Sequence, residues 1–275
     1  MTTTETLSYN RLEYEFKKLY KSNKELISNI YYAESVQQGI LPHERHFKRL
    51  FENYFILYKA QGIISGDLYW VGQKGKHKYF AVGDCTGHGV SGAMLSVVAL
   101  SFLNYIVLAK EFDEIGDVLR RLDKKWIETF HQGAEWGYNN DWLEIGICSF
   151  NEETRELQFA GAFNKLTLIN ENNITEFIGN KYPIGGWQLE RNREYKTFSV
   201  ILKENTSVYL YSDGFKDQFG EVSKKRFSSK RFREMLFKYH ELSMNKQKTN
   251  IEIELNTWKG SEEQTDDICV LGLTL

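Results

Sequence analysis

The sequence predicts an α+β domain in which antiparallel sheets and helices form separate layers, preceded by one long N-terminal helix. Short β-rich runs and helical stretches are grouped along the chain and do not strictly alternate. This grouping favours antiparallel sheets over a doubly wound parallel sheet. The chain has 275 residues, of which 41% are apolar, and this is enough to build a packed core without disulfide bonds.

The first segment, residues 1–42, is predicted to be a single helix with a heptad seam. The helix ends at Leu41, because Pro42 disfavours helical geometry in the residue before it. Two interpretations stay open: the seam pairs with a second copy as a signal-carrying coiled coil, or the helix lies on its own domain. The seam residues are spaced alternately four and three apart and include two polar ones: Leu12, Phe16, Leu19, Asn23, Leu26, Ile30, Ala33, Gln37 and Ile40.

The second segment, residues 43–275, begins with strands and continues with two helices. β-branched and aromatic runs between glycine or polar turns predict strands at 54–58, 68–72 and 78–82. The uncharged stretch 90–109 is long enough to cross a bilayer, but it contains serine, glycine and asparagine and follows a glycine-rich turn. We therefore expect a helix buried inside the domain and no membrane insertion. An amphipathic helix is predicted at 113–130.

The rest of the chain forms a second β-rich block followed by helices and one more strand. No repeat, low-complexity tract or convincing linker interrupts it, so residues 43–275 are expected to form one domain. The predicted strands are 143–150, 156–160, 165–169, 197–201, 207–211 and 268–273, and the predicted helices are 230–239 and 245–258.

Charge and cysteine content exclude several classes of protein. The formal net charge is -2 and no long run of one sign occurs, which argues against a nucleic-acid or membrane-surface protein held by bulk electrostatics. Three widely spaced cysteines, Cys85, Cys148 and Cys269, indicate neither a disulfide framework nor a zinc cluster. The first residues lack the basic start and apolar core of a secretory signal. A cytoplasmic protein with a small-molecule or protein partner is expected.

Four acidic turns lie at the edges of the β-rich runs. Each places an aspartate beside glycine or a second aspartate, namely Asp67, Asp84, Asp213 and Asp266. A single carboxylate at a strand end is usually a solvated turn residue, but four of them can converge. Mg²⁺ and Mn²⁺ prefer oxygen ligands, and a pair of such ions about 4 Å apart needs several carboxylates. The pattern is therefore a candidate two-metal site.

Five phrases, in this order, resemble the SpoIIE-like branch of the metal-dependent serine/threonine protein phosphatases. They are ILP at 40–42, ISGDLYWV at 64–71, VGDCTGHGVSGAMLS at 82–96, YSDGF at 211–215 and TDDI at 265–268. The resemblance runs from about residue 33 to the C-terminus, and five ordered phrases are far more specific than a lone glycine motif. It implies an αββα sandwich, two antiparallel sheets flanked by helices, with two Mn²⁺ or Mg²⁺ ions at one end of the sheets.

The resemblance also implies the role of each acidic residue. Asp84 corresponds to the bridge between both ions, Asp67 to a ligand of one ion, and Asp213 and Asp266 to ligands of the other. Cys85 would contribute only its backbone carbonyl. The implied reaction is direct hydrolysis by a metal-activated water, with Asp84 and Asp213 acting through that water and with no phosphoenzyme.

Other polar residues are weaker candidates. His88 could be a general acid, but the proton-donating histidine of the eukaryotic-type branch falls where this chain has Thr86, so a structural role in the turn is favoured. Two departures from the family pattern concern the substrate groove: Ser91 replaces a usual proline, and Phe163-Asn164-Lys165 replaces a polar, proline-bearing phrase. Residues that could support the site are Asp267, Asp217, Asn164 and, more weakly, Glu144.

The function that follows is a phosphatase acting on a phosphoserine or phosphothreonine of a bacterial signalling protein, commonly an anti-sigma-factor antagonist in this family. Two alternatives stay open. The chain could be a binding module on the phosphatase fold with little or no turnover, or a metal-dependent hydrolase of small phosphoesters. The expected partner is a phosphoprotein, with a possible homodimer through the N-terminal helix.

Overall fold

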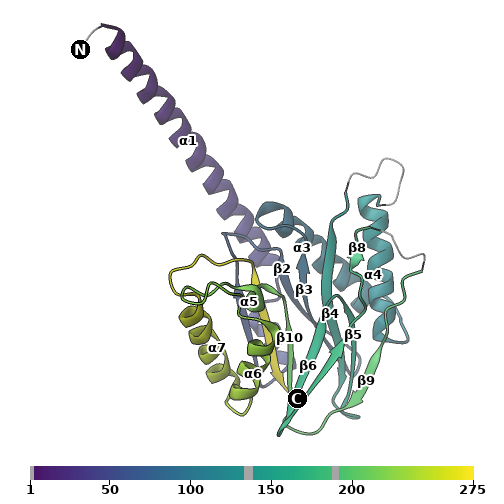
Figure 1. Ribbon diagram of the computed structural model, residues 1–275. Helices are drawn as coiled ribbons and strands as arrows, with labels where there is room; N and C mark the ends of the chain where they lie inside the picture. The colour runs from purple at the N-terminus through teal and green to yellow at the C-terminus, as the bar shows by residue number, and fades with distance from the viewer. Residues whose placement is uncertain (1–2, 133–138, 188–191) are drawn as a thin grey trace.

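The computed structural model describes residues 3–132, 139–187 and 192–275, and it forms two stacked β-sheets covered by helices on both outer faces (Figure 1). Every strand pair within the two sheets is antiparallel. The first sheet consists, in spatial order, of β1 (Tyr54–Lys59), β11 (Ile268–Thr274), β10 (Ser207–Tyr211), β6 (Lys165–Asn170) and β7 (Asn173–Ile178). The second consists of β2 (Asp67–Lys74), β3 (His77–Cys85), β4 (Trp142–Asn151), β5 (Glu156–Ala162) and β9 (Phe198–Ile201), with β8 (Ile184–Gly185) beside β4.

Apolar side chains form three layers of core between these elements. One layer lies between the sheets and includes Phe80, Phe159 and Leu210. A second lies between the β2–β9 sheet and the helices α3 (Val90–Leu103) and α4 (Ile115–Phe130). The third lies between the other sheet and the helices α6 (Ser229–Tyr239) and α7 (Met244–Lys259). The αββα sandwich expected from the sequence is therefore confirmed.

Four elements lie outside the sequence-based prediction, one of them the two-residue strand β8. α2 (Glu44–Leu50) is short and buries only Phe47 and Leu50, so its sequence shows no repeated helical spacing of apolar residues. β7 has no buried residue because it is an edge strand, so its sequence shows no alternation of apolar and polar residues. α5 (Gly214–Asp217) is a single turn. The sequence signal for each was weak for a physical reason: the element is short, or, in β7, it has no buried face.

The N-terminal helix α1 (Thr3–Ile40) projects from the sandwich as a single rod of 38 residues (Figure 1). Seam residues in its outer part, such as Leu12, Phe16 and Leu19, are exposed. Near its end, Gln37 is buried against the domain. The reading in which the helix lies on its own domain thus holds only for the last turns, and the outer seam has no partner within the described chain.

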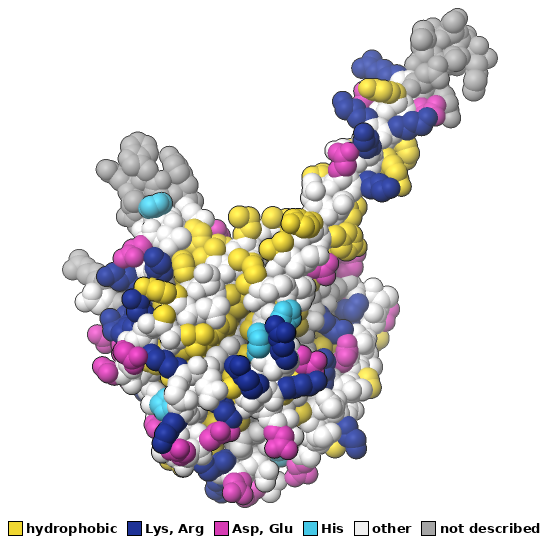
Figure 2. Space-filling view, turned by 180° about the vertical axis from the view of Figure 1, so that it is seen from behind, with side chains coloured by type: hydrophobic (Ala, Val, Ile, Leu, Met, Phe, Trp, Pro, Cys, Tyr) yellow, Lys and Arg dark blue, Asp and Glu magenta, His cyan; other side chains and the backbone are white. Residues whose placement is uncertain are grey.

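The uncharged stretch forms α3 and continues as a π-helical turn, η1 (Asn104–Leu108). The helix Val90–Leu108 is long and apolar enough to cross a membrane, but half of the tested window is buried inside the domain, as predicted for a core helix. Its outer face is apolar as well, with Met94 and Tyr105 exposed. Figure 2 shows hydrophobic side chains gathered on this rear face and along the projecting helix.

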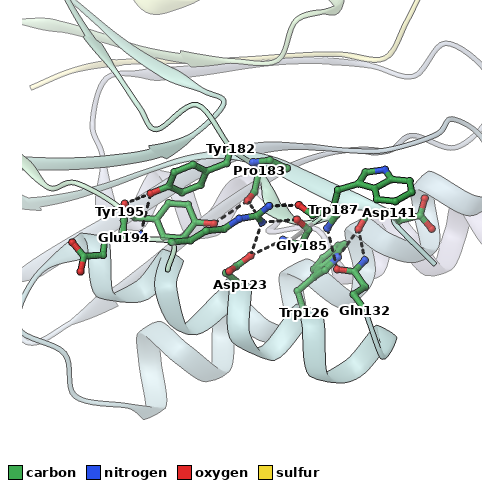
Figure 3. Close-up of polar contacts among 12 residues, drawn as sticks. Asp123, Trp126, Gln132, Asp141, Tyr182, Pro183, Gly185, Trp187, Glu194 and Tyr195 are labelled. Atoms are coloured by element: carbon green, nitrogen blue, oxygen red, sulfur yellow. Dashed lines mark hydrogen bonds and ion pairs between the residues drawn. The ribbon is translucent and has the colours of Figure 1, made fainter. Parts of the chain in front are cut away.

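A buried polar network ties the chain between β7 and β9 to α4 (Figure 3). The Arg193 guanidinium donates to Asp123 Oδ1 at 3.3 Å and to the carbonyls of Pro183 at 3.1 Å, Gly185 at 2.6 Å and Trp187 at 2.6 Å. Asp123 Oδ1 also accepts from the Gly185 N–H at 2.7 Å. Burial raises the pKa of Asp123, because the cost of desolvating the carboxylate outweighs these favourable contacts.

Asp123→Ala is expected to destabilise the fold by about 3 kcal/mol, because it removes a buried partner of the guanidinium and the acceptor of the Gly185 N–H. Asp117→Ala on the same helix is the control, since Asp117 forms an ion pair with Arg120 at the surface and its loss should cost less than about 1 kcal/mol. Urea unfolding of the two variants measures both values. Equal losses would show that the network does not stabilise the loop.

Candidate metal centre

Strand register places two of the predicted aspartates directly opposite each other. β2 begins at Asp67, β3 ends at Cys85, and their antiparallel pairing sets Asp67 against Asp84. On the other side of β3, Asp84 is paired with Glu144 of β4. Paired residues on neighbouring strands lie about 5 Å apart, so three carboxyl groups are held in a row at one end of the sheet.

The first sheet, which contains β10 and β11, brings the remaining two aspartates to the same end of the sandwich. Asp213 follows β10 directly, and Asp266 lies two residues before β11. The Ser212 hydroxyl donates to Asp67 Oδ2 at 2.6 Å, so the end of β10 contacts the start of β2. The Ser212 N–H also donates to the Cys269 carbonyl at 2.9 Å. The structure thus brings together all four aspartates that the sequence singled out.

These carboxyl groups are fully or partly buried, and no described residue forms an ion pair with any of the four aspartates. Asp67 is fully buried, and among the described residues its Oδ1 and the Oδ1 of Asp213 have no hydrogen-bond partner. A buried carboxylate oxygen that lacks a donor is costly. Two such oxygens at one site are what a cation would satisfy.

The pKa values of the cluster are shifted in the direction that excess negative charge demands. Burial, followed by repulsion from Asp213 and Asp266, raises the pKa of Asp84 to about 8. Burial and the neighbouring Asp84 raise the pKa of Asp67 well above its ordinary value. The pKa of Glu144 rises to about 7, mainly through burial and then through Asp213. Divalent cations would reverse these shifts by neutralising the carboxylates.

The donor set fits hard divalent cations, although the side chains do not form a finished cage. Within the described ranges, no group of three or more His, Cys, Asp or Glu side chains is already arranged around a common metal position. Carboxylates that repel one another do not converge on a single point by themselves. In addition, Mg²⁺ keeps several waters and takes only one or two carboxylates in most sites. The fit therefore rests on oxygen donors, their burial and their unpartnered atoms.

Asp267 supports the site by holding the Asp67 turn. Its two carboxylate oxygens accept the backbone N–H groups of Gln61 and Gly66, each at 2.7 Å. The glycine is required at this point, because a Cβ on Gly66 would lie 2.8 Å from the Gly87 carbonyl oxygen. The turns that carry Asp67 and Asp84 thus cross in close contact, and Asp267 fixes that crossing from the other sheet.

The other predicted support residues have different surroundings. Asn164 is buried, accepts the Lys165 N–H and donates to the Tyr211 carbonyl at 3.3 Å, so it joins the β5–β6 turn to the end of β10. Asp217 forms an ion pair with Arg226 at 3.2 Å. The Cys85 thiol is buried, and burial raises its pKa, which agrees with a contribution limited to its backbone.

Two cavities meet at the acidic cluster, and Asp84 and Glu144 line both. The more open one also contains Cys85, His88 and Asp266. His88 is exposed, and it accepts a hydrogen bond from the Ser91 hydroxyl at its backbone carbonyl. This position is compatible with a general acid and with a structural role in the turn, so the function of His88 stays a prediction.

Sequence reasoning missed the residue that connects α1 to this site. The Gln37 amide donates to the Ser65 carbonyl at 2.6 Å and to the Ser96 hydroxyl at 2.9 Å, and it accepts the Ser65 N–H at 3.2 Å. Ser65 in turn accepts the Asp67 N–H through its hydroxyl. The available signal was a polar residue on an apolar seam, and such a residue does not identify the partner of its side chain.

Comparison with known proteins agrees with this geometry. The family model of stage II sporulation protein E (SpoIIE) matches residues 74–275. No curated protein matches the chain in sequence.

Among solved structures, the SiaA-PP2C domain of Pseudomonas aeruginosa superimposes with a TM-score of 0.83 at 26% identity, over 92% of this chain and 98% of that one. The PP2C phosphatase domain of SpoIIE from Bacillus subtilis, with part of its regulatory domain, gives 0.63 at 16% identity, over 81% and 63% of the two chains. RsbX gives 0.54 at 17% identity, over 81% and 94%. The chain therefore belongs to the SpoIIE family, within the PP2C-type serine/threonine phosphatases.

Proposed function

We propose that this protein is a metal-dependent phosphatase that hydrolyses a phosphoserine or phosphothreonine of a bacterial signalling partner. The observation that carries this proposal is the meeting of Asp67, Asp84, Asp213 and Asp266 at one end of the sandwich, with buried carboxylate oxygens left without donors. An anti-sigma-factor antagonist is the class of substrate that the family resemblance suggests.

The acidic residues would divide between two Mn²⁺ or Mg²⁺ ions. Asp67 and the Cys85 carbonyl would hold one ion, Asp213 and Asp266 the other, and Asp84 would bridge both. Such a pair supplies an activated water and neutralises charge on the phosphoryl oxygens. Asp267 and Ser212 would keep Asp67 in place. The solved structure of RsbX is a complex with magnesium, which supports a divalent ion of this kind here.

Asp84→Asn is expected to lower kcat for a phosphoserine protein by more than about 100-fold with Mn²⁺ present, since loss of a supporting residue alone costs 10–100-fold at metal sites. Asp113→Asn, at an exposed position before α4, is the matched control and should retain activity. Phosphate release measures both. Equal turnover in the Asp84 variant would contradict the proposal, and absence of metal-dependent turnover in the wild type would favour a binding module. A preference for small phosphoesters over every phosphoprotein would favour the third function.

The metal-free protein is expected to lose stability as the pH rises from 6 to 8. The folded state holds a proton on Asp84, whose pKa is about 8, whereas the unfolded chain has already lost it near pH 4. Stability is therefore present at low pH and is lost as the pH rises through the folded-state pKa, by about 1.4 kcal/mol per pH unit for each such proton.

Thermal unfolding at several pH values measures this slope, and Mn²⁺ at pH 8 should raise Tm in a way that a chelator reverses. Asp84→Asn should flatten the slope, while Asp113→Asn should keep it. A metal-free protein whose stability rises between pH 6 and 8 would refute the account of the cluster.

We further propose that the outer seam of α1 pairs with a second copy and that the position of α1 regulates the site. The exposed Leu12, Phe16 and Leu19 support pairing, and the Gln37–Ser65 contacts support coupling to the Asp67 turn. An upstream partner that moves α1 would shift the population of competent sites.

Leu19→Glu is expected to convert a dimer into a monomer, because it places a charge on the seam. Tyr14→Glu, on the exposed opposite face of the same helix, should leave the dimer intact. Light scattering gives the mass of each. If the wild type is monomeric, or if deletion of residues 1–31 changes neither mass nor activity, this proposal is wrong.

A further inference from the structure

A second cavity of about 140 Å³ opens beside the acidic cluster. It shares Asp84, Glu144 and Asp213 with that cluster. The rest of its wall comes from the β5–β6 turn, the chain that follows β7, and α5. These segments contribute Phe163, Lys165, Ile178, Lys181 and Lys216 to the wall. A group held by the aspartates would therefore extend directly into this cavity.

Two chain segments cross in close contact at the wall of the cavity. A Cβ on Gly179 would lie 2.4 Å from the Gly161 carbonyl oxygen, so only glycine allows the crossing. The Asn180 N–H donates to the same carbonyl at 2.7 Å, and the Phe163 N–H donates to the Asn180 carbonyl at 2.9 Å. The Asn180 amide also binds the Glu194 carbonyl at 2.8 Å, close to the Arg193 network.

Phe163 combines backbone strain with exposure. Its φ of 52° lies in the left-handed region, which is unfavourable for a bulky residue, and its residue surface is 51% exposed. Because the Phe163 side chain is not buried, its packing in the core does not compensate this backbone strain. Ile178, on the same cavity, is 66% exposed. Two large apolar side chains at a cavity mouth, one of them on a strained backbone, indicate a contact surface for a ligand.

The same cavity presents two available cations. Lys165 is held by Glu176 at 2.5 Å, and Glu176 also binds Arg233. By contrast, Lys181 and Lys216 line the cavity, and neither forms an ion pair with any other part of the described chain. Lys216 lies close enough to the cluster to oppose the rise in pKa of Asp213 and Glu144. A dianionic phosphate is the complementary charge for these lysines.

We propose that this cavity is the substrate subsite and that it selects a phosphoserine or phosphothreonine followed or preceded by a large apolar residue. Lys181 and Lys216 bind the phosphate, while Phe163 and Ile178 pack on the neighbouring apolar side chain. This inference rests on the proposed phosphatase function and adds the sequence preference of the substrate. It also gives a role to the Phe163-Asn164-Lys165 phrase, in which this chain departs from the family pattern.

Two phosphoserine peptides that differ only in leucine or glycine beside the phosphorylated residue test the apolar contact. With Mn²⁺-loaded wild type, kcat/KM should favour the leucine peptide about 10-fold. Phe163→Gly and Ile178→Ala should each reduce this ratio at least threefold. Phe163→Gly removes the strained conformation, so its Tm should not fall. Ile201→Ala is the matched control, since Ile201 is 64% exposed on β9 outside the cavity, and it should keep the wild-type ratio.

Inhibition by inorganic phosphate tests the cations. The inhibition constant should rise about fivefold in Lys216→Gln and in Lys181→Gln, and it should not change in the exposed control Lys203→Gln. A wild type that hydrolyses both peptides equally, with an unaltered ratio in Phe163→Gly, would overturn the subsite while leaving the phosphatase function intact. Absence of metal-dependent hydrolysis of both peptides and of para-nitrophenyl phosphate would overturn both.

Discussion

The whole arrangement depends on holding several carboxyl groups together where they repel one another. Antiparallel pairing fixes Asp67 opposite Asp84, and Ser212 joins that pair to the other sheet. The backbone supplies the restraint that the charges oppose: β3 is paired on both sides, and the edge strand β2 is held at Asp67 by contacts from the other sheet. The helices on the outer faces keep the sheets stacked. In this sense the sandwich supports the acidic end, where buried carboxylates raise one another's pKa.

Much of this could be predicted from the sequence, and the parts that could not share one property. Grouped strands and helices predict layered antiparallel sheets, and the resemblance to the phosphatase family adds the αββα order. The aspartates stand at strand ends beside glycine or a second aspartate. By contrast, the pairing of Arg193 with Asp123 and of Gln37 with Ser65 joins residues 70 and 28 positions apart. A single polar residue carries no sequence period that identifies its partner, so only the tertiary structure reveals such a contact.

The outer residues of α1 illustrate the opposite limitation. Their heptad spacing is a clear local signal, yet a local signal states only that a face is apolar and cannot say what covers it. Within the described chain that face divides: Gln37 and its neighbours meet the domain, and Leu12 to Leu26 meet solvent. The interpretation in which the helix lies on its own domain thus describes only its last turns.

The length of α1 has a mechanical consequence for Gln37. A helix of 38 residues spans roughly 57 Å at a rise of 1.5 Å per residue. The outer end of α1 lies far from the sandwich, so a sideways force on it would bend the helix. A rotation about the helix axis would instead be transmitted to Gln37 through the continuous backbone hydrogen bonds. Rotation by one residue step is about 100°, enough to carry the amide away from Ser65. In the regulation proposed above, a rotation of α1 would therefore act on the turn beside Asp67 through the Gln37 amide.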